Sequence, residues 1–213
     1  MVIRLTKGRL KVAIAENRAE LGEVAAREVA AYIMALQKEK PEVNIIFASA
    51  PSQNEFLANL LHYDIDWGRI NAFHMDEYIG IDPHAPQSFG QFLRDRIFSK
   101  RIFKSVNYIN PQAADPEAEC ARYAALLRQM PADMVFLGIG ENGHLAFNDP
   151  HVAFFDDPLT VKTVDLDPTC IRQQVNDGCF SSIDQVPTRA YTITIPELLY
   201  VKKLFAIVPT IAK

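Results

Sequence analysis

A histidine and an aspartate follow a buried apolar run in the second half of the chain. Residues 135–139 are almost entirely apolar, which is typical of a buried strand, and the chain continues through a glycine-rich stretch to His144 and Asp149. A histidine titrates near neutral pH and can carry protons to and from a substrate. Ligands of open α/β sheets bind outside the carboxyl ends of the strands. We therefore expect His144 and Asp149 to lie at a site and not in the core.

Two adjacent carboxylates, Asp76 and Glu77, follow another predicted strand at residues 70–75. They could form a solvated turn closed by Gly80. A carboxylate at the floor of a partly dry cleft, however, has a raised pKa and can remove a proton from a carbon next to a carbonyl. Asp76 is therefore a candidate general base.

The segment Ser49–Glu55 joins a predicted strand at residues 43–48 to a helical pattern. Ser52 and Glu55 have the spacing of a capping box, which would fix the start of the helix. The same turn could hold a phosphate on free N–H groups at the helix N-terminus. The capping box is the simpler interpretation, because the loop lacks a glycine to bring the backbone close to a ligand.

Strand-like runs alternate with helical patterns along the chain, which predicts an α/β fold with a mainly parallel sheet and helices on both faces. A length of 213 residues with 49% apolar residues favours one domain over residues 1–213. No helix follows the last predicted strand to cover it, so the C-terminal part of that domain is expected to be incomplete. The expected strands are residues 11–15, 43–48, 70–75, 105–109, 133–139, 160–164, 191–195 and 204–208.

The composition of the chain argues against several classes of function. A net charge of −4 without clustered basic residues argues against a nucleic-acid-binding surface. No apolar run approaches the roughly 20 residues that span a bilayer, and the N-terminus lacks a signal-peptide core, so we predict a cytoplasmic protein without membrane contact. The three cysteines form no CxxC pair, which disfavours a zinc site.

The glycines at 138, 140 and 143 match the spacing of a dinucleotide-binding fingerprint. Asn148-Asp149-Pro150 would interrupt the helix that the fingerprint requires. No acidic residue about 20 positions later ends a clear second strand. Nicotinamide or flavin binding is therefore disfavoured.

Two motifs, Phe73–Gly80 and Leu137–Pro150, resemble those of the glucosamine-6-phosphate deaminase (isomerase) family, whose relatives include the 6-phosphogluconolactonases. Residues 86–89, 186–187 and Thr192 support the resemblance, which covers nearly the whole chain. It implies a three-layer Rossmann-like fold. The implied reaction converts glucosamine 6-phosphate and water to fructose 6-phosphate and ammonia, without metal or organic cofactor.

The resemblance also implies roles for individual residues. Asp76 corresponds to the base that moves a proton between C2 and C1, and His144 to the histidine that opens the sugar ring. Asn142 and Asp149 fall where two carboxyl-type residues usually orient that histidine; Asn142 removes one negative charge there, and Asp149 is shorter than the usual Glu. Glu77 and Gly140, from the same motifs, are predicted to bind substrate.

The phosphate-binding residues depart from the family pattern. The loop reads Ser49-Ala50-Pro51-Ser52-Gln53, and Pro51 removes one donor N–H, although Ser49 and Ser52 could still donate. The position of a family arginine falls at Thr160, with Lys162 as a nearby substitute. Lys213 has the spacing of the family's phosphate-binding lysine. A lysine replaces the charge of arginine but not its bidentate geometry.

These departures leave the substrate open among hexosamine phosphates. The alternatives are a sugar-lactone hydrolase like the 6-phosphogluconolactonases, or a non-catalytic domain that senses a sugar phosphate. The run at residues 75–78 favours the deaminase over the lactonase. A domain that only binds has no need of a base beside a titrating acid. Apart from a sugar phosphate, the only partner expected is a second copy of the chain in a homo-oligomer.

Overall fold

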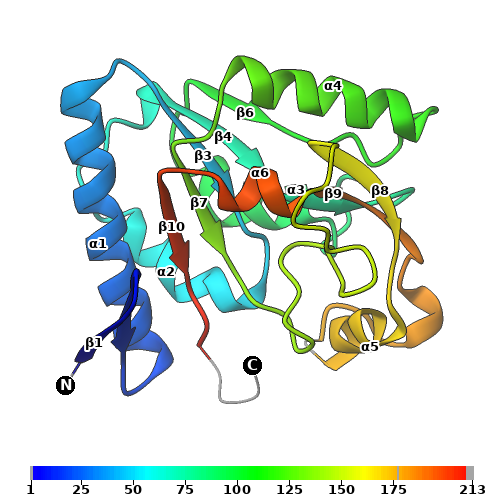
Figure 1. Cartoon of the computed structure of the whole chain (residues 1–213), viewed down its shortest axis with the longest axis horizontal. Coiled ribbons are helices and arrows are strands. Elements are labelled where there is room, and N and C mark those ends of the chain that lie inside the picture. Colours follow the sequence, from blue (N-terminus) through cyan, green and yellow to red (C-terminus); the bar gives the residue numbers. More distant parts are fainter. Residues whose placement is uncertain (1, 177, 210–213) are drawn as a thin grey trace.

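The computed structural model describes residues 2–176 and 178–209. Its main sheet has five parallel strands in the order β10-β7-β3-β4-β6, and helices pack on both faces (Figure 1). This confirms the predicted α/β class. No helix within the described ranges is both long and apolar enough to cross a bilayer. The strands are β3 (Val43–Phe47), β4 (Ile70–His74), β6 (Ser105–Asn107), β7 (Met134–Leu137) and β10 (Lys203–Ala206).

Alternating residues of the sheet supply two separate cores. Along β3, Ile45 and Phe47 face α1 (Arg18–Glu39) and α2 (Asn54–Leu60), whereas Ile46 faces the opposite layer. The opposite layer contains α4 (Pro116–Gln129) and α6 (Ile195–Leu199). Because strand residues point alternately to the two faces, a run that is buried throughout requires both layers. The sheet is thereby held rigidly in the middle of the fold.

Side chains cap two of the helices. Those of Ser88 and Asp115 accept backbone N–H bonds at the starts of α3 (Phe89–Leu93) and α4. The predicted capping box of Ser52 and Glu55 is wrong. Glu55 instead forms an ion pair with Arg18 of α1, at 2.8 Å between Nη2 and Oε2.

Close packing of α1 on α2 explains this difference. A Cβ added at Gly22 would lie 2.6 Å from the Cβ of Glu55, so only glycine allows the two helices to approach so closely. The contact brings the start of α1 within reach of Glu55. A 3-10 turn at Pro51–Gln53 precedes α2 instead of a side-chain cap.

A second, antiparallel sheet follows the order β5-β9-β8 and contains β5 (Asp76–Tyr78), β8 (Val161–Asp165) and β9 (Arg189–Ile193). Helix α5 lies between β8 and β9, yet these strands pair antiparallel, so the parallel pairing expected from the alternation of strands and helices does not hold for this part. The chain passes from the parallel to the antiparallel sheet at Met75, between β4 and β5. Near the N-terminus, β1 (Ile3–Lys7) and β2 (Leu10–Ile14) form a separate hairpin.

Candidate active site

The predicted site lies where the order of the parallel strands reverses. From β3 the chain proceeds to β4 and β6 on one side, and from β7 to β10 on the other. The loops after β3 and β7 therefore diverge at their carboxyl ends and leave a crevice, which is the usual ligand site of such sheets. A cavity occupies this position. Its lining includes the predicted residues Ser49, Ser52, Asp76, Gly140 and His144.

Asp76 begins β5 at one wall of the cavity and is only 6% exposed. Burial raises the pKa of its carboxyl well above the usual range, and the adjacent carboxyl of Glu77 raises it further. A carboxylate is a stronger base when its pKa approaches the working pH. The environment of Asp76 therefore suits removal of a proton from carbon.

His144 faces the same cavity from the loop after β7. Its Nδ1 lies 2.7 Å from Oδ1 of Asn142 and 3.2 Å from Oδ1 of Asp149. Both neighbours are acceptors, because the Asn142 amide nitrogen is used in donating to Asp149 at 2.9 Å. Nδ1 therefore carries the hydrogen, which leaves Nε2 free to exchange a proton with a ligand.

Gly140 makes room for this imidazole ring. A Cβ at position 140 would lie 2.2 Å from Cε1 and 2.3 Å from Nε2 of His144. The Gly140 N–H also donates to the His144 carbonyl at 2.9 Å. The structure thus gives Gly140 a steric role beside the histidine as well as a place in the cavity wall.

Asp149 is fully buried behind His144. Burial alone would raise its pKa, but the hydrogen bonds from His144, Asn142 and the N–H of Asp167 outweigh burial and lower it. Asp149 is therefore an anion that can stabilise a protonated His144. The Cys170 thiol lies nearby, with donor atoms of the three side chains within 4.8 Å of one another. Because both Asp149 oxygens already accept hydrogen bonds, we interpret this group as a hydrogen-bonded cluster.

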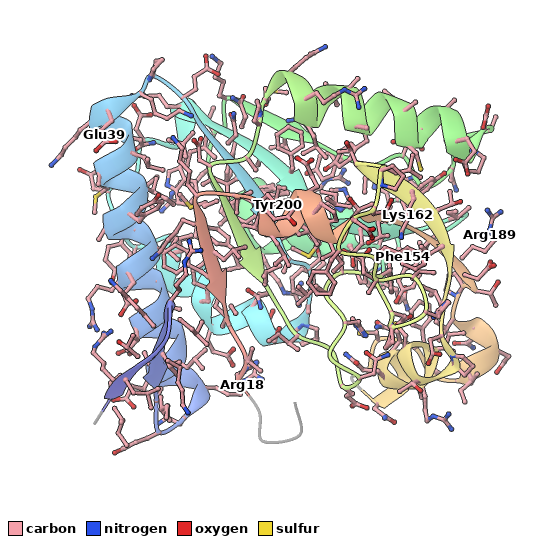
Figure 2. All side chains as sticks on the ribbon, in the orientation of Figure 1. Arg18, Glu39, Phe154, Lys162, Arg189 and Tyr200 are labelled. Carbon is pink, nitrogen blue, oxygen red and sulfur yellow. The ribbon has the colours of Figure 1, made fainter. Side chains whose placement is uncertain are left out.

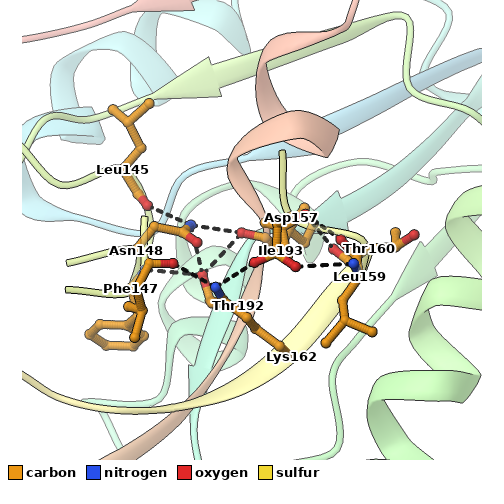
Figure 3. Close-up of polar contacts among 11 residues, drawn as sticks. Leu145, Phe147, Asn148, Asp157, Leu159, Thr160, Lys162, Thr192 and Ile193 are labelled. Atoms are coloured by element: carbon orange, nitrogen blue, oxygen red, sulfur yellow. Dashed lines mark hydrogen bonds and ion pairs between the residues drawn. The ribbon is translucent and has the colours of Figure 1, made fainter. Parts of the chain in front are cut away.

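Asn148 fixes the loop that follows His144. Its amide nitrogen donates to the carbonyls of Leu145 and Ile193 and to the hydroxyl of Thr192 (Figure 3). Ala146, which lines the cavity, has a φ of +51°, a conformation that costs free energy in a residue other than glycine. The Asn148 bonds to β9 hold the loop in this shape.

Part of the cavity lining is polar but uncharged. The Ser49 hydroxyl is buried and has no hydrogen-bond partner among the described residues. Gln174 of α5 (Pro168–Asn176) is 7% exposed and also lines the cavity, and no hydrogen bond engages its side chain within the described ranges. No lysine or arginine is among the described residues of the lining. These two groups could donate to an anionic or hydroxyl-rich ligand.

The structure does not bring Glu77 into the cavity. Its carboxylate accepts from the Ser88 hydroxyl and from the backbone N–H groups of Tyr78, Phe89 and Gly90, at 2.8 to 3.1 Å. Burial raises its pKa, and these four bonds lower it in part. Glu77 therefore joins β5 to the start of α3 instead of binding a ligand, because side chains of consecutive strand residues point to opposite faces.

Replacing Glu77 by glutamine is expected to destabilise the fold without changing substrate affinity. The amide NH₂ would face at least one of the four donors, and each buried donor left unpaired costs about 1–3 kcal/mol. Urea denaturation should show a lower midpoint, while KM stays within about twofold of the wild-type value. A large rise in KM with unchanged stability would instead indicate a binding role for Glu77.

Lys162 also lies outside the cavity lining. Its ammonium donates to Oδ2 of Asp157 and to the carbonyl of Val152, both at 2.6 Å, and lies 5.1 Å from the ring centre of Phe154 (Figures 2 and 3). These contacts use the charge of Lys162 to hold residues 152–157 on β8. The structure therefore does not place Lys162 in the cavity lining, where a substitute for a phosphate-binding arginine is expected. Lys213 lies outside the described residues.

Some residues of the site escape prediction from the sequence. Gln173 and Gln174 project into the cavity from α5, and Phe89 and Cys179 complete the lining. The one feature of the sequence that could have indicated them is the pair of polar residues on the inner side of a short amphipathic helix. His74, which contacts the backbone of Asp76, resembles an ordinary core residue in the sequence.

Comparison with known proteins identifies the family. The sequence profile of glucosamine-6-phosphate isomerases/6-phosphogluconolactonase matches residues 16–152. A glucosamine-6-phosphate deaminase of Listeria innocua is 38% identical over 164 residues, which are 76% of this chain and 68% of that protein. The Streptococcus sanguinis deaminase is 35% identical over 198 residues, or 92% of this chain and 79% of that protein.

Solved structures show the same fold. A monomeric glucosamine-6-phosphate deaminase of the NagB superfamily superposes with a TM-score of 0.79 at 30% identity, covering 90% of this chain and 79% of that one. A 6-phosphogluconolactonase of Thermotoga maritima superposes with a TM-score of 0.68 at 17% identity, covering 88% of this chain and 94% of that one. The chain therefore belongs to the glucosamine-6-phosphate isomerase/6-phosphogluconolactonase family.

Proposed function

We propose that this protein converts glucosamine 6-phosphate and water to fructose 6-phosphate and ammonia. The observation that carries the proposal is the pairing of Asp76 with His144 in one cavity. One is a buried carboxyl with a raised pKa, and the other is an imidazole whose Nδ1 is held by Asn142 and Asp149. The deaminase names of the relatives at 35–38% identity support the same activity.

The site geometry supports a reaction in three steps. His144 takes the proton of the C1 hydroxyl on Nε2 and gives it to the ring oxygen as the bond between C1 and that oxygen breaks, and the open-chain aldehyde forms. Asp76 then removes the proton from C2 while the aldehyde oxygen takes a proton from the substrate's ammonium group, which gives an enolamine, and Asp76 returns its proton to C1, which leaves an iminium at C2. Water adds to this iminium, one proton of that water passes to the nitrogen, and ammonia leaves as the C2 hydroxyl loses its proton to form the ketone. Asp149 stabilises the imidazolium form of His144 during proton exchange.

The loop after β3 is the proposed phosphate site. Ser49 offers its unpartnered hydroxyl, and backbone N–H groups before α2 can donate to an anion. Gln174 of α5 can donate its amide to the phosphate or to a sugar hydroxyl. The proposed cation is Lys213.

A direct test is to incubate the protein with glucosamine 6-phosphate and measure ammonia and fructose 6-phosphate in the same samples. Equal amounts of both products would support the proposal. Release of neither product would contradict it. A parallel assay with 6-phosphogluconolactone would then identify a lactonase, and substrate binding without turnover in either assay would identify a sensing domain.

Replacing Ser49 by alanine is expected to raise KM for glucosamine 6-phosphate by about tenfold or more, because a hydrogen bond to a charged group contributes roughly 1.5–3 kcal/mol. The variant should keep kcat within about threefold, since the phosphate is remote from C1 and C2. Ser52→Ala tests the second hydroxyl of this loop, which accepts from Gln53 at 3.0 Å but keeps its own hydrogen to donate. An unchanged KM in Ser49→Ala would rule out this phosphate position.

The other expectations from the sequence stay proposals. The acidic net charge supports a protein that binds no nucleic acid. A cytoplasmic location suits an enzyme of phosphorylated sugars. Assembly into a homo-oligomer can be measured by light scattering of the purified protein.

A further inference from the structure

The proposed base stands at the junction of the two sheets. β4 ends at His74 in the parallel sheet, β5 begins at Asp76 in the antiparallel sheet, and only Met75 separates them. The Met75 carbonyl accepts from the N–H of Ile193, which is already a contact of the second sheet. Asp76 then pairs with Thr192 of β9 in the second sheet, but its own carbonyl oxygen is engaged by the side chain of His74.

The imidazole of His74 spans this break. The side chain is fully buried, its Nδ1 lies 2.9 Å from the carbonyl oxygen of Asp76, and its Nε2 lies 2.9 Å from the backbone nitrogen of Ile109. A backbone N–H can only donate, so Nε2 is an acceptor and Nδ1 carries the hydrogen. Nδ1–H therefore donates to the Asp76 carbonyl in a single neutral tautomer.

The charge state of His74 is constant over the working range. Burial lowers its pKa to about 4, although the bond to the Asp76 carbonyl raises it slightly. The ionisable groups nearest to His74 in the sequence are the carboxyls of Asp76 and Glu77, and both are buried. His74 thus holds no charge that could serve the reaction directly, and it does not line the cavity.

We propose that His74 is a positioning residue, whose Nδ1–H bond to the Asp76 carbonyl fixes the backbone from which the catalytic carboxylate projects. This inference rests on the proposed role of Asp76 as the base. A carboxylate one carbon from the main chain moves with any rotation of that peptide. A displacement of about 1 Å at a reacting group can lower the rate about 100-fold.

Two substitutions test the two hydrogen bonds of the His74 imidazole separately. In His74→Asn the side-chain NH₂ lies near the original Nδ1 and can still donate to the Asp76 carbonyl, but the acceptor for Ile109 is lost. In His74→Gln the longer side chain reaches the original Nε2 and can accept from Ile109, but the donor to Asp76 is lost. Both variants remove one buried hydrogen bond, so their losses of stability should be similar.

Tyr123→Phe provides a matched structural control. The Tyr123 hydroxyl accepts from the His74 N–H at 3.0 Å and donates to the His74 carbonyl at 2.8 Å. It therefore stabilises the same end of β4 without contacting Asp76. Its removal should lower the melting temperature with little change in kcat.

The expected result is a decrease in kcat of about 10- to 100-fold for His74→Gln, with KM nearly unchanged, and rescue to within about threefold of wild type by His74→Asn. Equal activity of the two variants, or losses that follow melting temperature across all three proteins, would overturn the proposal. If the wild-type protein shows no deaminase activity, the proposed function itself fails, and the catalytic part of this inference fails with it.

A measurement on the ligand-free protein tests the contact independently of turnover. Nitrogen-15 NMR of the histidines should assign to His74 a proton on Nδ1 and none on Nε2 between pH 5 and 8. The signal should disappear in His74→Asn and in His74→Gln. A tautomer with the proton on Nε2, or titration near pH 6.5, would overturn the inference even if the enzyme is active.

Discussion

Asp76→Asn is expected to lower kcat for glucosamine 6-phosphate by about 10²- to 10⁴-fold, the usual contribution of a general acid–base group. An amide cannot accept the proton from C2, although it can occupy the same space. Exchange of the C2 hydrogen with deuterium from solvent, followed by NMR, should disappear together with ammonia release. Full C2 exchange in this variant would show that another group is the base.

The same substitution is expected to stabilise the fold at neutral pH. The pKa of Asp76 is raised in the folded protein, so the folded state binds this proton more tightly than the unfolded chain does. Stability is therefore highest below the unfolded pKa and decreases as pH rises toward the folded pKa. Asp76→Asn removes this pH-dependent loss, and its melting temperature should exceed that of wild type above about pH 6.

Asp149→Asn is the control for the predicted direction of the stability change in Asp76→Asn. The pKa of Asp149 is lowered in the folded state, so its contribution to stability is present above the unfolded pKa and is lost as pH falls. This variant should therefore melt at a lower temperature than wild type at pH 7. The same direction of change in both variants would contradict the assigned environments of the two carboxyls.

Gly140→Ala is expected to lower kcat by about 100-fold. The added Cβ would lie 2.2 Å from the imidazole of His144, so the ring must leave its place over the glycine. Its Nδ1 bonds to Asn142 and Asp149 would then be lost, and a displacement of about 1 Å is enough for a 100-fold loss. The kinetic measurement should be paired with the proton chemical shift of Nδ1 of His144.

Gly138→Ala is the control for a methyl group added to the same cavity wall. The nearest side-chain atom to that Cβ would be Oγ of Ser52 at 3.4 Å, an ordinary contact, and His144 is not among its neighbours. A much smaller effect on kcat is expected. Equal losses in the two alanine variants would show that the cavity wall, and not the imidazole, is the sensitive element.

The sequence was sufficient to predict the parallel sheet and the strand ends at the site. The runs of β3, β4 and β7 are rich in apolar, β-branched and aromatic residues, and such runs indicate strands covered on both faces. Polar residues that follow them, such as Asp76 and His144, must then meet at one edge of the sheet. This reasoning depends only on local pattern and on the direction of parallel strands.

The antiparallel sheet and the roles of two charged residues could not be predicted in this way. The pairing of β5 with β9 joins residues more than 100 positions apart, and a three-residue strand carries little pattern of its own. Glu77 and Lys162 are engaged by tertiary partners, the start of α3 and Asp157, that no local spacing indicates. Both residues are charged, and the sequence predicts that they bind substrate. Whether a charged side chain lines the cavity depends on where it points, and both point to other partners.

The junction at Met75 divides the site between two structural units. His144 and the loop at Ser49 extend from the five-stranded sheet, whereas Asp76 begins the three-stranded sheet, and Gln174 lies on the helix that connects two strands of that smaller sheet. Substitutions in that connecting helix can therefore alter the ligand-facing wall while the buried framework beneath the histidine is preserved. A fold with this division can acquire new sugar specificities through changes in that helix, while the parallel sheet and its core stay the same.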